Sequence, residues 1–359
     1  MDINHLHLYV DEPRACHQWW VENCSFQSVP ELAAQFEADS AVQRADIRLL
    51  FSGATAGGVG AHSPVDEFLR RYSPGVADVA FRVRDLDCTL AQVRRAGGQV
   101  LRPPQAIAGL ANGGRWGRIQ GWGGLVHTLI EPGLANRSRS PEGFSDARSP
   151  LPWQAVDHAV LNVAAHHLEA AASWYERTLG FCRQQQFAIQ TPNSGLNSLV
   201  LRHPEGTATL PINEPTSPNS QVQEFLDYHG GAGIQHVALR THNLVQTVAV
   251  LRRRGVQFLT VPPTYYEQLR QRPGFWHGAG DWAAIARHQI LVDWPPDCPQ
   301  ARLLQTFTQP LFERPTFFLE LIERQMVPSG SVVAEGFGEG NFQALFEAIE
   351  REQRQRGSL

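Results

Sequence analysis

Apolar and polar residues alternate along the chain in an order that occurs twice. The run HLHLYV at residues 5–10 matches HAVLNV at 158–163, and both runs of apolar and β-branched residues are typical of strands. A helical pattern with paired aromatic residues follows each run, at 15–26 and at 170–181. The pattern therefore predicts that a strand is followed by an amphipathic helix in both halves of the chain.

The repeat continues with further strands and helices. Strands are predicted at 76–86 and 234–244, and the helices after them end at Gly97 and Gly255. The final strands, HTLIE and LELIE, are further apart in the sequence than the earlier pairs, so the second copy is longer than the first. Duplicated units of one strand, one helix and further strands predict an α+β fold in which a curved sheet encloses a cleft.

The segment between the two copies has a different composition. It is rich in Pro, Gly, Ser and Arg and has no periodicity, which is typical of a linker. We therefore predict an N-terminal domain at 1–135, a linker at 136–152 and a C-terminal domain at 153–359. A glycine-rich loop leads into a final amphipathic helix at 341–356, which we interpret as a lid over the cleft, hinged on glycines, and not as a phosphate-binding loop.

Three strand positions differ between the copies in a way that bears on chemistry. In the second copy they are His158, His236 and Glu320. In the first copy they are His5, Asp78 and Thr128. Two imidazoles and one carboxylate form the ligand set of a non-heme Fe(II) site with open coordination positions, and zinc binds the same donors. The sequence thus predicts a metal site in the second copy, whereas Thr128 is a poor ligand and leaves the first copy without one.

Other side chains of the second copy suit an aromatic ligand. Amide and hydroxyl groups that bind a phenol or a carboxylate without adding charge are offered by Ser198, Asn213, Gln221, Gln235 and Gln305. Phe307 and Phe318 are candidates to sandwich an aromatic ring, and Phe318 precedes Glu320 by two residues, which places both on one face of a strand.

Composition excludes several classes of function. The formal net charge of −4 gives no basic surface for nucleic acids or anionic membranes. None of the 359 residues is lysine, which excludes Schiff-base lysine chemistry and a complete P-loop. The five cysteines are scattered, so we expect buried thiols and no thiolate zinc site. Neither a signal sequence nor a long apolar run is present, and we expect a cytoplasmic protein.

The second half resembles the 4-hydroxyphenylpyruvate dioxygenase family of the vicinal oxygen chelate superfamily. The resemblance covers nearly all of residues 153–357 and rests on SGLNS, LPINEP, GAGIQHVAL, GVQFLTVPPTYY, RLLQTFT, RPTFFLELIER and GFGEGNFQALFEAIEREQ. The first half is similar only in outline. The resemblance implies tandem vicinal-oxygen-chelate domains built from βαβββ units, with a C-terminal gating helix and a metal site in the second domain alone.

The resemblance also implies roles for individual residues. His158, His236 and Glu320 would hold Fe(II), and the five amide and hydroxyl residues named above would orient the substrate. The pocket and its helical gate would be lined by Phe307, Phe318, Phe337, Asn341 and Phe342. The implied reaction converts 4-hydroxyphenylpyruvate and O2 to homogentisate and CO2 by decarboxylation, ring hydroxylation and side-chain migration, a step of tyrosine catabolism. A homo-oligomer is also implied.

Three alternatives stay open from the sequence. A hydroxymandelate synthase uses the same substrate and iron but hydroxylates the benzylic carbon, although Asn213 and Phe342 resemble the dioxygenase pattern. An extradiol catechol dioxygenase would also use two histidines and one glutamate in tandem modules. A metal-free binding protein of the same fold would bind aromatic ligands without consuming O2.

Overall fold

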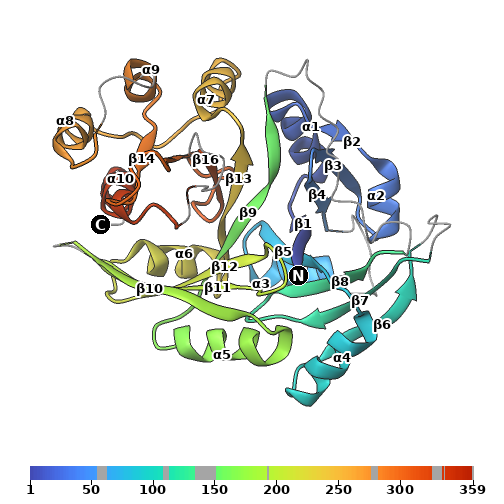
Figure 1. Cartoon of the computed structure of the whole chain (residues 1–359). Helices are drawn as coiled ribbons and strands as arrows, with labels where there is room; N and C mark the ends of the chain where they lie inside the picture. Colours follow the sequence, from blue (N-terminus) through green and yellow to red (C-terminus); the bar gives the residue numbers. More distant parts are fainter. Residues whose placement is uncertain are drawn as a thin grey trace.

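The computed structural model contains two eight-stranded β-sheets, one formed by each half of the chain (Figure 1). It describes residues 1–54, 63–107, 113–133, 151–191, 194–275, 282–325, 334 and 336–357, without the side chains of residues 339 and 343. The predicted linker at 136–152 lies outside these ranges except for its last two residues.

The N-terminal half consists of two successive units. The first contains β1 (Asp2–Tyr9), α1 (Pro13–Cys24), β2 (Gln27–Ser28), α2 (Pro30–Gln35), β3 (Ser40–Arg44) and β4 (Ile47–Ser52). The second contains α3 (Pro64–Arg71), β5 (Gly75–Arg82), α4 (Leu86–Arg95), β6 (Val100–Ala106), β7 (Arg115–Gln120) and β8 (Val126–Glu131).

The C-terminal half follows the same order with additions. Its first unit contains β9 (Trp153–Asn162), α5 (Leu168–Leu179), β10 (Cys182–Gln190), β11 (Gly195–Arg202) and β12 (Thr209–Pro215). Its second contains α6 (Gln221–His229), β13 (Gly233–Thr241), α7 (Leu244–Arg253), α8 (Pro263–Gln271), α9 (Trp282–Arg287), β14 (Leu291–Asp293), β15 (Leu303–Phe307) and β16 (Phe318–Arg324), and α10 (Glu339–Arg356) ends the chain. The additional length of the second copy lies mainly in α8, α9 and α10.

The strand orders of the two sheets correspond. They are β2-β3-β4-β1-β5-β8-β7-β6 and β10-β11-β12-β9-β13-β16-β15-β14. The two central strands of each sheet, β1 and β5 or β9 and β13, pair antiparallel with each other. On its other side, each central strand pairs with a parallel neighbour. Each half is thus two βαβββ units joined at their first strands, which confirms the predicted α+β fold.

The helices begin slightly before the predicted positions. The patterns at 15–26 and 170–181 correspond to α1 and α5, which end before Phe26 and Phe181, and both phenylalanines are buried just beyond their helices. Gly97 and Gly255 follow α4 and α7 with φ of 80° and 91°, a conformation that glycine adopts without a Cβ clash. The two helix ends predicted from these glycines are therefore confirmed.

One hydrophobic core runs through both halves. It contains residues of α1, α4, α5 and α7 together with one face of each sheet, and α4 packs directly against α5. Tyr175 of α5 is fully buried, and its hydroxyl lies 3.0 Å from His127 Nε2 of β8. Burying each large apolar side chain of such a core contributes about 1.5–3 kcal/mol. The shared core fixes the two halves relative to each other.

The other faces of the two sheets differ. In the N-terminal sheet a separate apolar cluster, which includes Phe36 and Trp116, fills the concave side beneath α2. In the C-terminal sheet α10 contacts both edge strands, β10 and β14, as well as α6 (Figure 1). The final helix therefore spans the opening of the second sheet.

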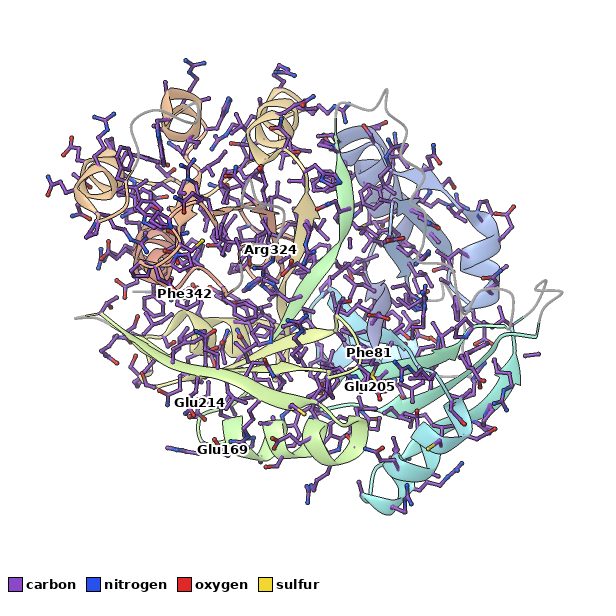
Figure 2. All side chains as sticks on the ribbon, viewed as in Figure 1. Phe81, Glu169, Glu205, Glu214, Arg324 and Phe342 are labelled. Carbon is purple, nitrogen blue, oxygen red and sulfur yellow. The ribbon has the colours of Figure 1, made fainter. Side chains whose placement is uncertain are left out.

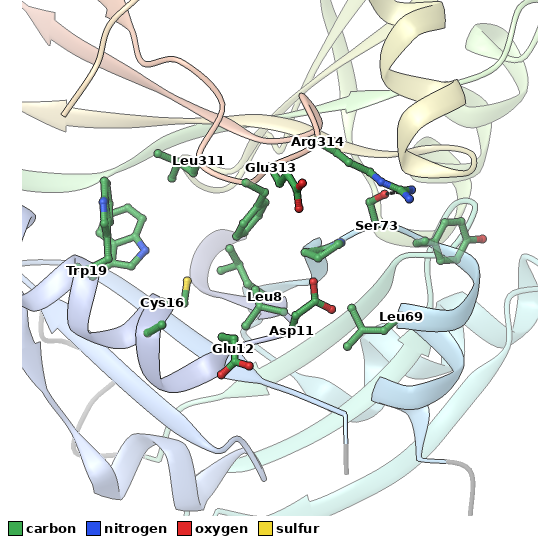
Figure 3. A pocket seen from close by; sticks show the side chains of 16 residues that line it. Leu8, Asp11, Glu12, Cys16, Trp19, Leu69, Ser73, Leu311, Glu313 and Arg314 are labelled. Atoms are coloured by element: carbon green, nitrogen blue, oxygen red, sulfur yellow. Dashed lines mark hydrogen bonds between the residues drawn. The ribbon is translucent and has the colours of Figure 1, made fainter. Parts of the chain in front are cut away.

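A large cavity of about 610 Å³ lies between the halves (Figure 3). Glu313 and Arg314, from the loop between β15 and β16, form one wall, and Asp11 and Glu12 form the opposite wall. Arg314 donates a hydrogen bond to Ser73 Oγ at 3.2 Å, which ties this loop to the N-terminal half. The cavity is separate from the predicted site residues.

Two further predictions can be compared with the structure. All five cysteines are free. Cys24 is buried as expected and Cys16 and Cys298 are half-buried, but the expectation was wrong for Cys88 and Cys182, which lie on the exposed sides of α4 and β10. Within the described residues, no helix is both long and apolar enough to span a membrane.

Candidate metal centre

The three predicted metal ligands come from adjacent strands. Ala238 of β13 is the register partner of His158 on β9 and also of Glu320 on β16. His236 precedes Ala238 by two residues, so its side chain points to the same face of the sheet. Strand pairing therefore brings together residues that lie far apart in the sequence.

The ligand atoms of this cluster lie within 4.8 Å of one another, and all three side chains are buried. His158 Nε2 is 3.1 Å and His236 Nε2 is 3.7 Å from the same oxygen, Glu320 Oε2. Two imidazole nitrogens and one carboxylate oxygen that converge in this way match the donors of a three-ligand metal site. Within the described residues, this is the only group of histidine, cysteine and acidic side chains with metal-binding geometry.

A carboxylate behind His158 fixes the orientation of its ring. Asp157 Oδ1 lies 3.0 Å from His158 Nδ1, and Asp157 is itself paired with Arg240 and Arg324. A hydrogen bond from Nδ1 to Asp157 leaves the Nε2 lone pair directed at the cluster, the arrangement found behind many metal-bound histidines. Asp157 reaches this position because it is the extra residue of a β-bulge between β9 and β13.

The charges around the cluster act on the two histidines in opposite directions. Burial lowers the pKa of His158, but the carboxylates of Glu320 and Asp157 outweigh burial and raise this pKa to about 9. Burial and the neighbouring His158 lower the pKa of His236 well below its usual value. The raised pKa means that His158 carries a proton at neutral pH when no metal is bound, and a metal cation would replace that proton.

Aromatic rings position the second histidine. The ring of His236 stacks on Phe318 with centroids 4.7 Å apart and an interplanar angle of 18°, and Phe307 lies edge-on to it at 6.4 Å. The ring of Phe337 lies 5.3 Å from that of His158. These contacts replace hydrogen bonding for His236, whose Nδ1 has no partner among the described residues.

The predicted ligand-orienting residues surround the same cavity. Besides the three candidate metal ligands, its wall includes Ser198, Asn213, Gln221, Gln235, Gln305, Phe307, Phe318, Phe337 and Phe342. Asn341 is the exception, because its buried amide points behind the wall and donates to Gln305 Oε1 at 2.9 Å. The structure therefore brings twelve of the thirteen predicted residues to one cavity and the thirteenth into contact with it.

Three of the polar side chains mark two separate ends of the cavity, Gln305 at one end and Ser198 and Asn213 at the other. Gln305 donates to Glu320 Oε1 at 2.9 Å, so it belongs to the metal end. Ser198 and Asn213 are register partners on β11 and β12, and Asn213 donates to Asn162 at 3.3 Å. Asn162 is four residues from His158 along β9, a separation of about 13 Å on a strand. The cavity thus has a metal end and a distant amide end.

Helix α10 forms the apolar roof. Phe342 lies on the side of α10 that faces β10, where its ring is 4.5 Å from that of Phe187 (Figure 2). Phe346 packs against α6, while Leu345 and Ile349 pack towards Phe307 and Phe318. The space that remains beneath the roof is about 80 Å³.

Sequence reasoning missed several residues that support the site. Asp157, Arg240 and Arg324 orient His158, and Tyr265 and Asp293 contact the start of α10. An aspartate directly before a predicted histidine ligand was an available signal for the first group. No local pattern pointed to Tyr265 or Asp293, because their partners lie more than 40 positions away in the sequence.

Comparisons with known proteins agree with the predicted resemblance. Residues 155–272 match the model of the Glyoxalase/Bleomycin resistance protein/Dioxygenase superfamily. The chain is 34% identical to a 4-hydroxyphenylpyruvate dioxygenase of Pyricularia oryzae, over 92% of this chain and 84% of the relative. It is 32% identical to that of Caenorhabditis elegans, over 99% of this chain and 93% of the relative.

Among solved structures, a mutant of 4-hydroxymandelate synthase from Streptomyces coelicolor is similar, with a TM-score of 0.81 and 26% identity over 98% of both chains. The extent of the sequence matches exceeds what a shared fold alone requires. The chain belongs to the 4-hydroxyphenylpyruvate dioxygenase family of the vicinal oxygen chelate superfamily.

Proposed function

We propose that this protein converts 4-hydroxyphenylpyruvate and O2 to homogentisate and CO2 with the help of Fe(II). The observation that carries the proposal is the buried cluster of His158, His236 and Glu320, which opens onto a cavity lined by phenylalanine rings and neutral amides. The reaction balances without a further reductant, because the substrate supplies all four electrons that O2 requires: two when the 2-oxo acid loses CO2 and two when the ring is hydroxylated.

The donor set fits a ferrous ion. Two imidazoles and one carboxylate leave coordination positions open on the side of the cavity, and Asp157 directs His158 Nε2 towards the cluster. When bound there, Fe(II) would supply a chelation site for the 2-oxo acid and a position for O2. Zinc accepts the same donors but has no redox chemistry, so it would not support this reaction.

The polarity of the cavity fits an anionic, aromatic substrate. Among the described wall residues none is arginine, so the negative charge of the 2-oxo acid would be compensated by the cation at the metal end. Gln305 would orient this group indirectly, by holding the ligand Glu320 with a hydrogen bond of 2.9 Å. The phenol ring would lie among the phenylalanines, with Ser198 and Asn213 positioned to bind the hydroxyl at the distant end.

The roof would exclude water from the reaction. A free space of about 80 Å³ is smaller than typical ligand pockets of about 300 Å³ or more, so α10 has to move outward for substrate to enter. Once closed, its apolar residues would keep solvent away from reactive species in the cavity.

Anaerobic addition of 4-hydroxyphenylpyruvate to the Fe(II)-loaded protein tests the proposal. Bidentate chelation by the 2-oxo acid should produce a weak visible charge-transfer band, and admission of O2 should then yield homogentisate and CO2. A protein that binds iron but neither shows the band nor consumes O2 with this substrate would contradict the proposed function.

Synthesis of 4-hydroxymandelate is the second candidate, because a 4-hydroxymandelate synthase has the same fold along the whole chain. Asn213 and Phe342 on the cavity wall favour homogentisate, as the resemblance described above implies. The two products are isomers, so chromatography against both standards, and not mass alone, distinguishes them. A homo-oligomeric assembly and a cytoplasmic location stay predictions.

A further inference from the structure

The beginning of α10 is fixed by side chains from other elements. Gly338, which precedes the helix, provides no side chain to cap it. Instead Asp293 of β14 accepts a hydrogen bond from the backbone N–H of Gly340 at 2.9 Å and is paired with Arg272 at 2.6 Å. A carboxylate at a helix N-terminus stabilises it by capping a free N–H and by its favourable charge.

A chain of hydrogen bonds connects the same helix turn to Glu320. The Tyr265 hydroxyl accepts from Val292 N–H at 2.8 Å. Two acceptors face its single proton, Asn341 Oδ1 at 2.7 Å and the Val292 carbonyl oxygen at 3.1 Å, and the shorter contact favours Asn341. Asn341 Nδ2 donates to Gln305 Oε1 at 2.9 Å. Gln305 Nε2 donates both to Glu320 Oε1 and to the carbonyl oxygen of Phe337, each at 2.9 Å.

The chemistry of each group fixes the direction of this chain. A carboxylate ligand only accepts, so Gln305 must present its NH2 group to Glu320 and its oxygen to Asn341. Asn341 must then present its own NH2 group to Gln305, which leaves Asn341 Oδ1 in need of a donor. The Tyr265 O–H is the donor that satisfies this oxygen.

The backbone approaches these groups so closely that side chains are excluded. A Cβ atom on Gly338, whose φ is 77°, would overlap the amide of Gln305. A Cβ atom on Gly340 would lie 2.5 Å from Asp293 Oδ1. The glycine-rich loop is thus shaped to bring the helix start against Gln305 and Asp293.

We propose that Tyr265 is a positioning residue that couples closure of α10 to the orientation of Gln305 beside the metal ligand Glu320. With α10 closed, the Tyr265 hydroxyl holds Asn341, and Asn341 holds the amide oxygen of Gln305. When α10 opens, Asn341 leaves with the helix and Gln305 loses its fixed orientation. The proposal rests on the proposed function in that it takes Glu320 to be a metal ligand.

Hydrogen exchange of α10 in the metal-free protein tests the coupling, with Tyr265→Phe compared with Tyr266→Phe. Tyr266 is a matched control because it is also half-buried and its hydroxyl donates to a backbone carbonyl, that of Ile290, at 3.1 Å. We expect amides of α10 to exchange about fivefold faster in Tyr265→Phe, the effect of losing one net hydrogen bond, and at the wild-type rate in Tyr266→Phe. Equal exchange of α10 in the two variants would overturn the proposal.

A double-variant cycle tests whether the coupling passes through Gln305. If it does, Tyr265→Phe accelerates α10 exchange less in a Gln305→Ala background than in the wild type, because the oriented acceptor is already lost. Additive effects would show that Tyr265 merely stabilises the fold. The thermal midpoints of both tyrosine variants serve as a check. If the two hydroxyls only stabilise the fold, both substitutions lower the midpoint and neither changes the exchange of α10 selectively.

Activity provides a separate readout. In the loaded enzyme, Tyr265→Phe should lower kcat about fivefold while Tyr266→Phe retains it. The exchange experiments need neither metal nor substrate. If the wild-type protein fails to make homogentisate, the proposed function is refuted, but the exchange experiments still test the coupling. A wild type that makes homogentisate but shows no selective exchange in Tyr265→Phe would refute the coupling alone.

Discussion

In the N-terminal sheet, His5 and Thr128 lie on either side of Ala80 on the central strand β5. His158 and Glu320 lie in the same way on either side of Ala238 on β13 in the C-terminal sheet. The β-bulge beside the histidine is also present in both sheets. In the first it contains Asn4, whose Oδ1 lies 2.9 Å from His5 Nδ1, and in the second it contains Asp157. The two copies thus share the framework of the site, including the group that orients the histidine.

They differ in the charge at its centre. Arg118 is paired with Thr128 in the ladder, at the position that Phe307 occupies opposite Glu320. Its Nε donates to Thr128 Oγ1 at 3.0 Å and lies 3.7 Å from Asp78 Oδ2. Burial, His7 and Arg118 all lower the pKa of His5, whereas carboxylates raise that of His158. The first copy therefore has a built-in cation, the guanidinium of Arg118, in the region where the second copy is arranged to bind a metal cation.

The volume inside the sheets differs as well. Trp116 pairs with Ile130 in the first copy, and Gln305 pairs with Ile322 in the second, so Trp116 and Gln305 occupy corresponding positions. The buried ring of Trp116 packs on Phe36, with ring centroids 5.7 Å apart. In the second copy the smaller amide leaves space, and α10 covers that space in place of a packed core. The comparison teaches that a few positions on one framework decide between a packed scaffold and a site.

Removal of the central carboxylate should have the largest effect. Glu320→Gln keeps the size of the side chain but removes its charge, so we expect metal affinity to fall by more than about 100-fold, beyond the loss typical when only a partner of a ligand is removed. Oxygen consumption should be abolished. The matched variant Thr128→Val should retain full oxygen consumption, and a similar loss in both would erase the distinction between the copies.

Removal of the built-in cation should affect stability and not chemistry. Arg118→Met leaves Asp78, which is only 2% exposed, without its guanidinium partner, and should reduce the free energy of unfolding by about 3 kcal/mol. Urea unfolding measures this change. The double variant Arg118→Met with Asp78→Asn should recover most of the stability, and a loss of turnover at unchanged stability would contradict the role given to Arg118.

The orienting groups of the two bulges should differ in importance. Asp157→Asn keeps an acceptor for His158 but removes the charge, and should weaken metal binding by about 10- to 100-fold. Asn4→Ala in the first copy should leave metal affinity unchanged. Titration with Co(II), restricted to protein shown to be folded by circular dichroism, compares the two. Equal affinities in both variants would place Asp157 outside the metal site.

The smallest effect concerns the pair Gln305 and Trp116. Gln305→Ala should retain metal but lower kcat by about tenfold, because Glu320 loses the hydrogen bond that orients it. Trp116→Phe should instead lower the free energy of unfolding by about 1–2 kcal/mol and leave kcat unchanged. Loss of metal from Gln305→Ala would show that this residue is needed for metal binding itself and not only for the orientation of Glu320.

The sequence by itself determined the repeat, the approximate helices and strands, and the three candidate ligands, because periodicity and residue type are local properties. It could not give the β-bulge that turns Asp157 towards His158, since a bulge depends on how two strands pair. It also could not show that Arg118 replaces a cation, or that Tyr265 reaches Gln305 through Asn341.

These contacts join residues far apart in the chain, and no periodic pattern specifies their geometry. Even Asn341, which the resemblance placed in the pocket, turned out to lie behind its wall, because its amide is satisfied by Tyr265 and Gln305. Composition therefore decided which chemistry was available to this protein. Only the pairing of strands and the closure of the last helix decided where that chemistry is assembled.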